Sequence, residues 1–193
     1  MTSPFDARPV VVALAGPNGA GKTTFHGAHL ASAGLRFVNA DELAREMEID
    51  AYEAAKLAQN VREALVEQRE SFVFETVFSD PAGDKLDLLR RARALGYTVV
   101  LCFIGLASPE LSDERVAMRV MQGGHDVPPE KLAARYPRSL ANLRRAIREL
   151  PHVLVFDNSD LRHPFRRVAE FVNGAPVGTL EPIPRWLRGV VAR

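Results

Sequence analysis

Short apolar segments alternate with amphipathic ones along most of this chain. The apolar segments are rich in β-branched and aromatic residues and are flanked by Gly, Pro or Asp, as buried strands commonly are. Strands are predicted at Pro9–Ala15, Leu35–Ala40, Ser71–Thr76, Tyr97–Gly105 and His152–Asn158. Alternation of buried strands with helices is typical of a parallel sheet covered on both faces. The pattern therefore predicts an α/β fold.

Helices are predicted between these strands. One apolar stripe at three- and four-residue steps is formed by Tyr52, Ala55, Ala58, Val61 and Leu65. A second segment, DKLDLLRRARALG, ends at Gly96, where a helix C-cap is expected.

The region of about 108–151 differs because it contains helical patterns and no strand pattern. Ser108 and Pro109 fit an N-cap followed by proline at the first helical position, and Gly123-Gly124 should end that helix. A second helix should begin at Pro129, with Pro137 kinking or dividing it. Its apolar stripe consists of Leu132, Tyr136, Leu140, Leu143, Ile147 and Leu150. We interpret the region as a helical insertion between two strands.

Length limits the number of domains. With 193 residues, 47% of them hydrophobic, the chain suits a single domain over residues 1–193. The tail of about 175–193 is proline-rich and is predicted to be extended over the surface, with Trp186 as its packing anchor.

Charge and cysteine content narrow the possible partners. The formal net charge is +1, so no overall field indicates a nucleic-acid or membrane partner. Cys102 lies in an apolar strand segment and is predicted to be a buried, unreactive thiol. No apolar segment has the length of a signal peptide or membrane span, which favours a cytoplasmic protein.

The segment GPNGAGKTT fits the phosphate-loop pattern G-x-x-x-x-G-K-[ST]. It follows the first predicted strand and opens a helix, so backbone N–H groups should converge on phosphate there. Lys22 should contact the β- and γ-phosphates of ATP, and the Thr23 hydroxyl should bind Mg²⁺. The predicted nucleotide-binding residues are Gly16, Pro17, Asn18, Gly19, Ala20, Gly21, Lys22, Thr23 and Thr24.

Acidic residues follow two other predicted strands. Asp41 comes after Leu35–Ala40, and Glu75 lies near the end of Ser71–Thr76. Ligands of such sheets bind beyond the carboxyl ends of the strands, so both carboxylates should face the phosphate loop. The strand Tyr97–Gly105 ends without an acid, unlike the Walker B strand of an ATPase. This arrangement favours a kinase.

Each acid has more than one interpretation. Asp41 is a candidate catalytic base, but it would also be a good N-cap for the helix that follows. Glu75 follows three apolar residues, and a buried carboxylate needs a ligand or a bonded partner. Thr76 is a second candidate for substrate binding. Asp157, at the end of the last strand, is either a turn cap or a site residue.

Arginines flank the Gly-Gly turn. Phosphoryl transfer develops charge on equatorial oxygens, which the guanidinium fork can meet with paired hydrogen bonds. Arg119 and Arg135 are therefore predicted to form a phosphate-binding lid. Solvated positions are predicted for Arg144, Arg145 and Arg148, and the sequence does not assign roles to Arg138 and His125.

The pieces GPNGAGKTT, NADELA, FVFETVFS and RVMQGGHDVPPEKLAARYPRSLANL occur in this order between Val10 and Leu143. Together they resemble the zeta toxin family of small bacterial kinases. The resemblance implies an adenylate-kinase-like P-loop fold with a five-stranded parallel sheet of order 2-3-1-4-5, and ATP and Mg²⁺ as cofactors. It also implies that Asp41 is the base, that Glu75 binds substrate, and that Arg119 and Arg135 contact the ATP phosphates.

Characterised zeta toxins phosphorylate a hydroxyl of UDP-N-acetylglucosamine. The resemblance thus implies a UDP-sugar acceptor and an antitoxin partner, neither of which can be read from the residues themselves. Two other functions stay open. A nucleic-acid 5′-hydroxyl kinase would need a basic channel lined by aromatic residues, which make up 7% of this chain. A nucleotide-dependent switch would need loops that order on γ-phosphate and a partner surface.

Overall fold

A seven-stranded sheet of order β2-β3-β1-β4-β5-β6-β7 forms the centre of the molecule. In this computed structural model, residues 3–121, 127–178 and 182–192 are described. The strands are β1 (Val10–Ala15), β2 (Arg36–Val38), β3 (Phe72–Thr76), β4 (Thr98–Gly105), β5 (His152–Asp157), β6 (Arg166–Val172) and β7 (Ala175–Pro176). Strands β1 to β5 pair in parallel in the order 2-3-1-4-5, which confirms the predicted α/β fold and its strand order.

The prediction of five strands is wrong, because β6 and β7 extend the sheet by antiparallel pairing. Strand β6 was missed because one of its faces is exposed, so charged residues interrupt its apolar pattern. Asn173 and Gly174 both have positive φ between the two strands. An Asn-Gly pair of this kind is a hairpin signal that the sequence does contain.

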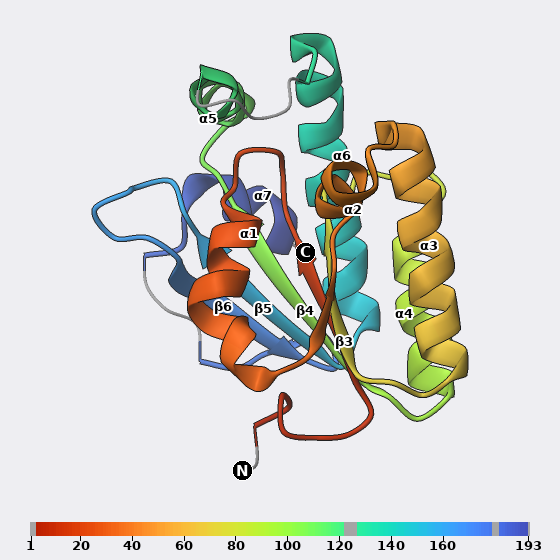
Figure 1. The fold of residues 1–193 in the computed structure, drawn as a ribbon. Coiled ribbons are helices and arrows are strands. Elements are labelled where there is room, and N and C mark those ends of the chain that lie inside the picture. The colour runs from red at the N-terminus through yellow and green to blue at the C-terminus, as the bar shows by residue number, and fades with distance from the viewer. Residues whose placement is uncertain (1–2, 122–126, 179–181, 193) are drawn as a thin grey trace.

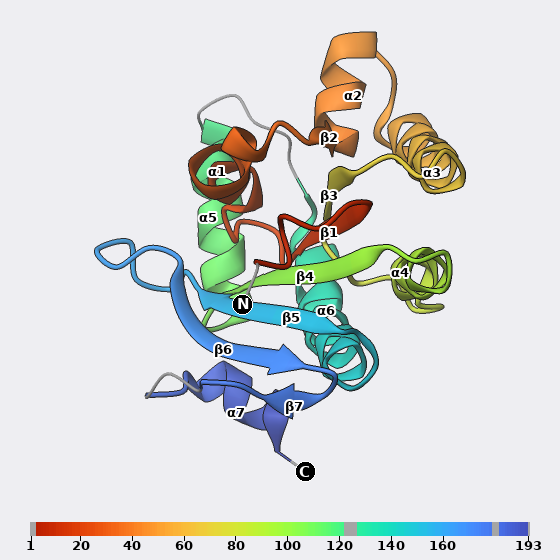
Figure 2. The same ribbon diagram turned by 90° about the horizontal axis from the view of Figure 1, so that it is seen from below.

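Helices cover both faces of the sheet. They are α1 (Lys22–Phe25), continued by a π turn (His26–Leu30) and a 3-10 turn (Ala31–Ala33), α2 (Ala40–Met47), α3 (Ala51–Glu67), α4 (Asp84–Ala94), α5 (Pro109–Met121), α6 (Pro129–Glu149) and α7 (Arg185–Val191). Figure 2 shows α1 and α5 on one face of the sheet and α3, α4 and α6 on the other. All of β1 is buried, because both of its faces are covered.

The face of α3 that packs on the sheet differs from the predicted stripe. Tyr52 is 81% exposed and Ala55 is also exposed. The buried residues of this helix are Ala54, Ala58, Arg62, Leu65 and Val66. Alanines occur on several sides of this helix, so the sequence does not show clearly which side is buried. The buried face also contains a charged residue, Arg62, which hides the apolar pattern.

The insertion between β4 and β5 consists of α5 and α6, as expected. The Leu111 N–H donates to the Ser108 hydroxyl at 3.3 Å, which confirms the predicted cap. Helix α6 continues through Pro137 without being divided. Proline has no N–H for the carbonyl one turn earlier, but Pro137 is exposed, so water can reach that side of the helix. The predicted turn at Gly123-Gly124 and His125 lie outside the described residues.

The tail is not simply extended, because it contains β7 and α7. Trp186 anchors α7 as predicted: it is 8% exposed and its indole N–H donates to Asp157 Oδ1 at 3.2 Å. It also packs so closely on Gly105 that a Cβ there would lie 2.1 Å from the indole ring. Arg144, predicted to be solvated, instead donates from Nε to the Val190 carbonyl at 3.0 Å and ties α6 to α7.

The buried position predicted for Cys102 is confirmed. Cys102 is fully buried on β4, and burial raises the pKa of its thiol to about 12. Within the described ranges, no helix is both long enough and apolar enough to cross a bilayer.

Candidate active site

The loop between β1 and α1 has a backbone that only glycine can provide at its first position. Gly16 has a φ of 145°, and a Cβ there would lie 2.1 Å from the carbonyl oxygen of Ile104 on β4. Gly21, just before α1, has a φ of 82° in the left-handed region. The loop thus passes tightly over the sheet before turning into the helix, as a phosphate-binding loop requires.

Two neighbouring side chains hold this loop from outside. The Ser112 hydroxyl on α5 donates to the Asn18 carbonyl at 2.6 Å. The buried Asn158 donates from Nδ2 to the Ala20 carbonyl at 2.9 Å and accepts the Phe165 N–H at 3.3 Å. Sequence reasoning missed both residues. Asp157 next to Asn158 binds Trp186 and the Ser159 hydroxyl, so its position matches a structural role.

Lys22 is the charged centre of the site. It is 6% exposed, and its Nζ donates to the Pro17 carbonyl at 3.1 Å and lies 3.6 Å from Glu75 Oε1. Burial lowers the pKa of this ammonium, while the negative charges of Glu75 and Asp41 raise it and the charge of Arg119 lowers it. These three charged groups therefore lie near Lys22 of α1 and come from three other elements, β3, α2 and α5.

Strand register explains why Glu75 reaches the phosphate loop. Leu14 of β1 is opposite Glu75 of β3, so the carboxylate lies beside the end of β1. Glu75 Oε2 accepts the Thr23 hydroxyl at 2.8 Å and the Asn39 amide N–H at 3.2 Å. This carboxylate, which is 14% exposed, thus has bonded partners, as its position in the strand requires. Thr23 and Glu75 form a pair of oxygen donors suited to Mg²⁺, which prefers such ligands.

The two interpretations of Asp41 can now be separated. The N-cap of α2 is Asn39, whose Oδ1 accepts the Asp41 backbone N–H at 2.9 Å. The side chain of Asp41 has no capping role and is exposed at the mouth of a pocket. Asn39, which sequence reasoning did not single out, combines the cap with the contact to Glu75.

The pocket has a volume of about 430 Å³, and Glu75, which lines it, accepts the hydroxyl of Thr23 at the end of the phosphate loop. Its lining comes from the start of α2 and the residue before it, from α3, from β3 and the loop after it, from α4 and from α6: Asn39, Ala40, Asp41, Ala55, Arg62, Glu75, Thr76, Val77, Phe78, Ser79, Asp80, Pro81, Lys85, Arg135 and Arg138. The Thr76 hydroxyl lines it while accepting the Phe78 N–H at 3.0 Å, so this residue also shapes the turn.

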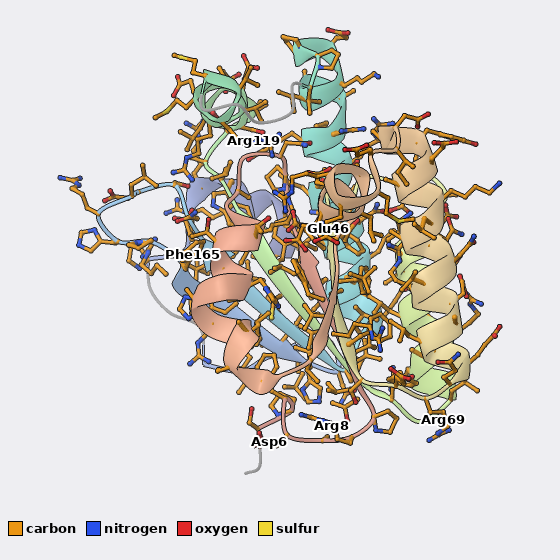
Figure 3. All side chains as sticks on the ribbon, in the orientation of Figure 1. Asp6, Arg8, Glu46, Arg69, Arg119 and Phe165 are labelled. Carbon is orange, nitrogen blue, oxygen red and sulfur yellow. The ribbon has the colours of Figure 1, made fainter. Side chains whose placement is uncertain are left out.

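The two arginines predicted to form a lid, Arg119 and Arg135, lie at the same end of the molecule. Figure 1 shows α5 and the start of α6 projecting beyond the carboxyl edge of the sheet, above the phosphate loop. Arg119 extends on that side (Figure 3), and its charge acts on Lys22. Arg135 and Arg138 line the pocket. Asp41, Glu75, Thr76 and Arg135 thus line one pocket, and the charges of Asp41, Glu75 and Arg119 act on Lys22. Arg62, which sequence reasoning overlooked, lines the same pocket.

This geometry can be compared with known proteins. A family model described as zeta toxin matches residues 41–166, more than half of the chain. This chain belongs to the zeta toxin family. No curated protein sequence matches it.

Solved structures show the same fold as this zeta toxin family member. A chain of the AvrRxo1-ORF1:AvrRxo1-ORF2 complex with sulphate ions has a TM-score of 0.71 and 20% identity, covering 96% of this chain and 64% of that one. A chain of the same complex with ATP has a TM-score of 0.66 and 21% identity, covering 89% of this chain and 60% of that one. A chain of the PezAT toxin-antitoxin system of Streptococcus pneumoniae has a TM-score of 0.61 and 20% identity, covering 84% of this chain and 72% of that one. This chain spans less than two thirds of the length of the AvrRxo1 chains.

Proposed function

We propose that this protein is a kinase that transfers the γ-phosphate of ATP to a hydroxyl of a small molecule held in the pocket. A UDP-sugar such as UDP-N-acetylglucosamine is the first acceptor to test, because the protein belongs to the zeta toxin family. An antitoxin is the corresponding candidate for a protein partner, since the PezAT neighbour is part of a toxin-antitoxin system.

The position of Asp41 carries this proposal. Its carboxylate lines the pocket, lies close enough to Lys22 to raise the pKa of that ammonium, and is free of the capping role that Asn39 fills. Asp41 can therefore accept the proton of an acceptor hydroxyl as its oxygen bonds to the γ-phosphorus and the bond to ADP breaks.

The remaining residues bind and orient. Lys22 and the backbone of the Gly16–Gly21 loop hold the nucleotide phosphates, and Arg119 and Arg135 meet the charge that develops on the transferring group. Thr23 and Glu75 would hold Mg²⁺, which when bound neutralises phosphate charge.

The test supplies γ-labelled ATP with pools of UDP-sugars, oligonucleotides or no acceptor, and compares wild type with Asp41→Asn. The Asn variant should lose about 10²–10⁴-fold in transfer while keeping its melting temperature and its affinity for nucleotide. Label appearing on oligonucleotides would replace the small-molecule proposal by a nucleic-acid kinase. Transfer at the wild-type rate in the variant would eliminate Asp41 as the base.

A further inference from the structure

Arg62 is a buried cation on the sheet-facing side of α3. Its side chain is 5% exposed, and its guanidinium carbon lies 5.4 Å from the centre of the Phe74 ring on β3. It also lines the pocket that contains Asp41. Figure 1 shows how α2, α3 and α6 gather at the carboxyl end of β3, where this pocket lies.

The protein does not neutralise this cation by direct contact. Its Nε is buried without a hydrogen-bond partner, and no ion pair joins Arg62 to any residue within 3–121, 127–178 or 182–192. The negative charge of Glu63 acts on Arg62, but Glu63 already forms an ion pair with Arg91 at 2.7 Å. Burial lowers the pKa of Arg62 to about 10, so it stays protonated at neutral pH.

The rest of the pocket has a surplus of positive charge. Lys85, Arg135 and Arg138 line it together with Arg62. Of the three acids in the lining, Glu75 is already paired with Lys22, and Asp41 is the proposed base. Asp80 remains, with Oδ1 buried and unbonded, and it influences Arg62 without forming an ion pair.

A purely structural role accounts poorly for this arrangement. A cation over an aromatic ring gains less free energy than is lost when a charge is buried without a bonded counter-ion. An apolar side chain of similar length would pack on Phe74 without that penalty. A ligand that supplies the missing negative charge would explain why arginine occupies the position.

We propose that Arg62 binds an acidic group of the acceptor, a carboxylate or a phosphate, while the acceptor hydroxyl faces Asp41. The planar guanidinium matches such groups because it can donate two parallel hydrogen bonds. The acceptor class is therefore an anionic hydroxy compound rather than a neutral polyol. This inference rests on the proposed function, which places the acceptor in this pocket.

The inference can be tested without knowing the acceptor. Protein saturated with Mg²⁺ and a non-hydrolysable ATP analogue, which fills the phosphate loop, is titrated calorimetrically with inorganic phosphate. Wild type should bind phosphate, and Arg62→Met should bind it at least about 10-fold more weakly. Arg148→Met is the matched control, because Arg148 is exposed on α6, and it should bind phosphate as wild type does.

Thermal melts without ligand distinguish a binding role from a structural one. Arg62→Met should melt at or above the wild-type temperature, because it removes a buried uncompensated charge. Arg62→Lys keeps the charge but not the fork, and should bind phosphate with intermediate affinity.

Phosphate binding by wild type and Arg62→Met with equal affinity would overturn the inference, as would its absence in wild type. Labelled-ATP assays run in parallel separate this failure from that of the proposed function. Transfer to an acceptor with the same KM in both proteins would reject only the role of Arg62. Absence of transfer to every acceptor would reject the kinase, while the titration still decides whether Arg62 binds an anion.

Discussion

Glu75→Gln should destabilise the nucleotide-free protein, because it removes the counter-charge of a buried lysine. Lys22 and Glu75 are 6% and 14% exposed, so water screens the pair weakly at its 3.6 Å separation. Removing one partner of a buried pair costs about 3–5 kcal/mol, and the Pro17 carbonyl and the charge of Asp41 remain to offset part of this. We expect a loss of about 2–4 kcal/mol.

That loss should lower the melting temperature by about 5–15 °C in a domain of this size. The matched control is Glu70→Gln, because Glu70 and Arg36 are also 3.6 Å apart but are 46% and 62% exposed. An exposed pair contributes only about 0–1 kcal/mol, so the control should melt close to wild type.

Nucleotide should rescue the variant. ADP phosphates supply Lys22 with negative charge, so ADP should raise the melting temperature of Glu75→Gln more than that of wild type. EDTA in both samples removes any contribution of magnesium held by Thr23 and Glu75. A wild-type melting temperature together with an unchanged ADP shift would refute the reasoning.

The pH dependence follows from the lowered pKa of Lys22. Loss of the Glu75 charge should lower that pKa further, since Glu75 acts to raise it. Between the folded and unfolded pKa values the unfolded chain binds more protons, so stability rises with pH in this interval. Relative to wild type, Glu75→Gln should therefore regain stability as the pH approaches the pKa of unfolded lysine, while its affinity for ADP falls.

Two further predictions concern the surroundings of the site. Asn158→Asp keeps the acceptor for the Phe165 N–H but loses the donor to the Ala20 carbonyl, so it should cost about 1–3 kcal/mol and weaken nucleotide binding. A nucleotide affinity and a melting temperature equal to those of wild type would show that the phosphate loop does not depend on the Asn158 hydrogen bond. Cys102 should react with a thiol reagent at least about 10³-fold more slowly than free cysteine, because β4 must unfold first. Fast labelling would instead reveal local opening of β4.

Residues that act through local backbone geometry could be assigned from the sequence. The phosphate loop, the Ser108 cap and the strands β1 to β5 each depend on neighbours in the chain, so a local pattern records them. The same holds for the placement of Asp41 and Glu75 at one edge, since parallel strands bring their carboxyl ends together.

Only the tertiary structure decided the partners of these groups. Asn39 rather than Asp41 caps α2, and the register of β1 with β3 brings Glu75 to Thr23 and Lys22. Sequence spacing cannot specify such contacts, because they depend on the register between paired strands and on side-chain conformation. Arg62 shows the limit most clearly. A charged residue in a helical segment is usually solvated. Only the packing of α3 on β3 buries the Arg62 cation at the pocket without a bonded counter-charge.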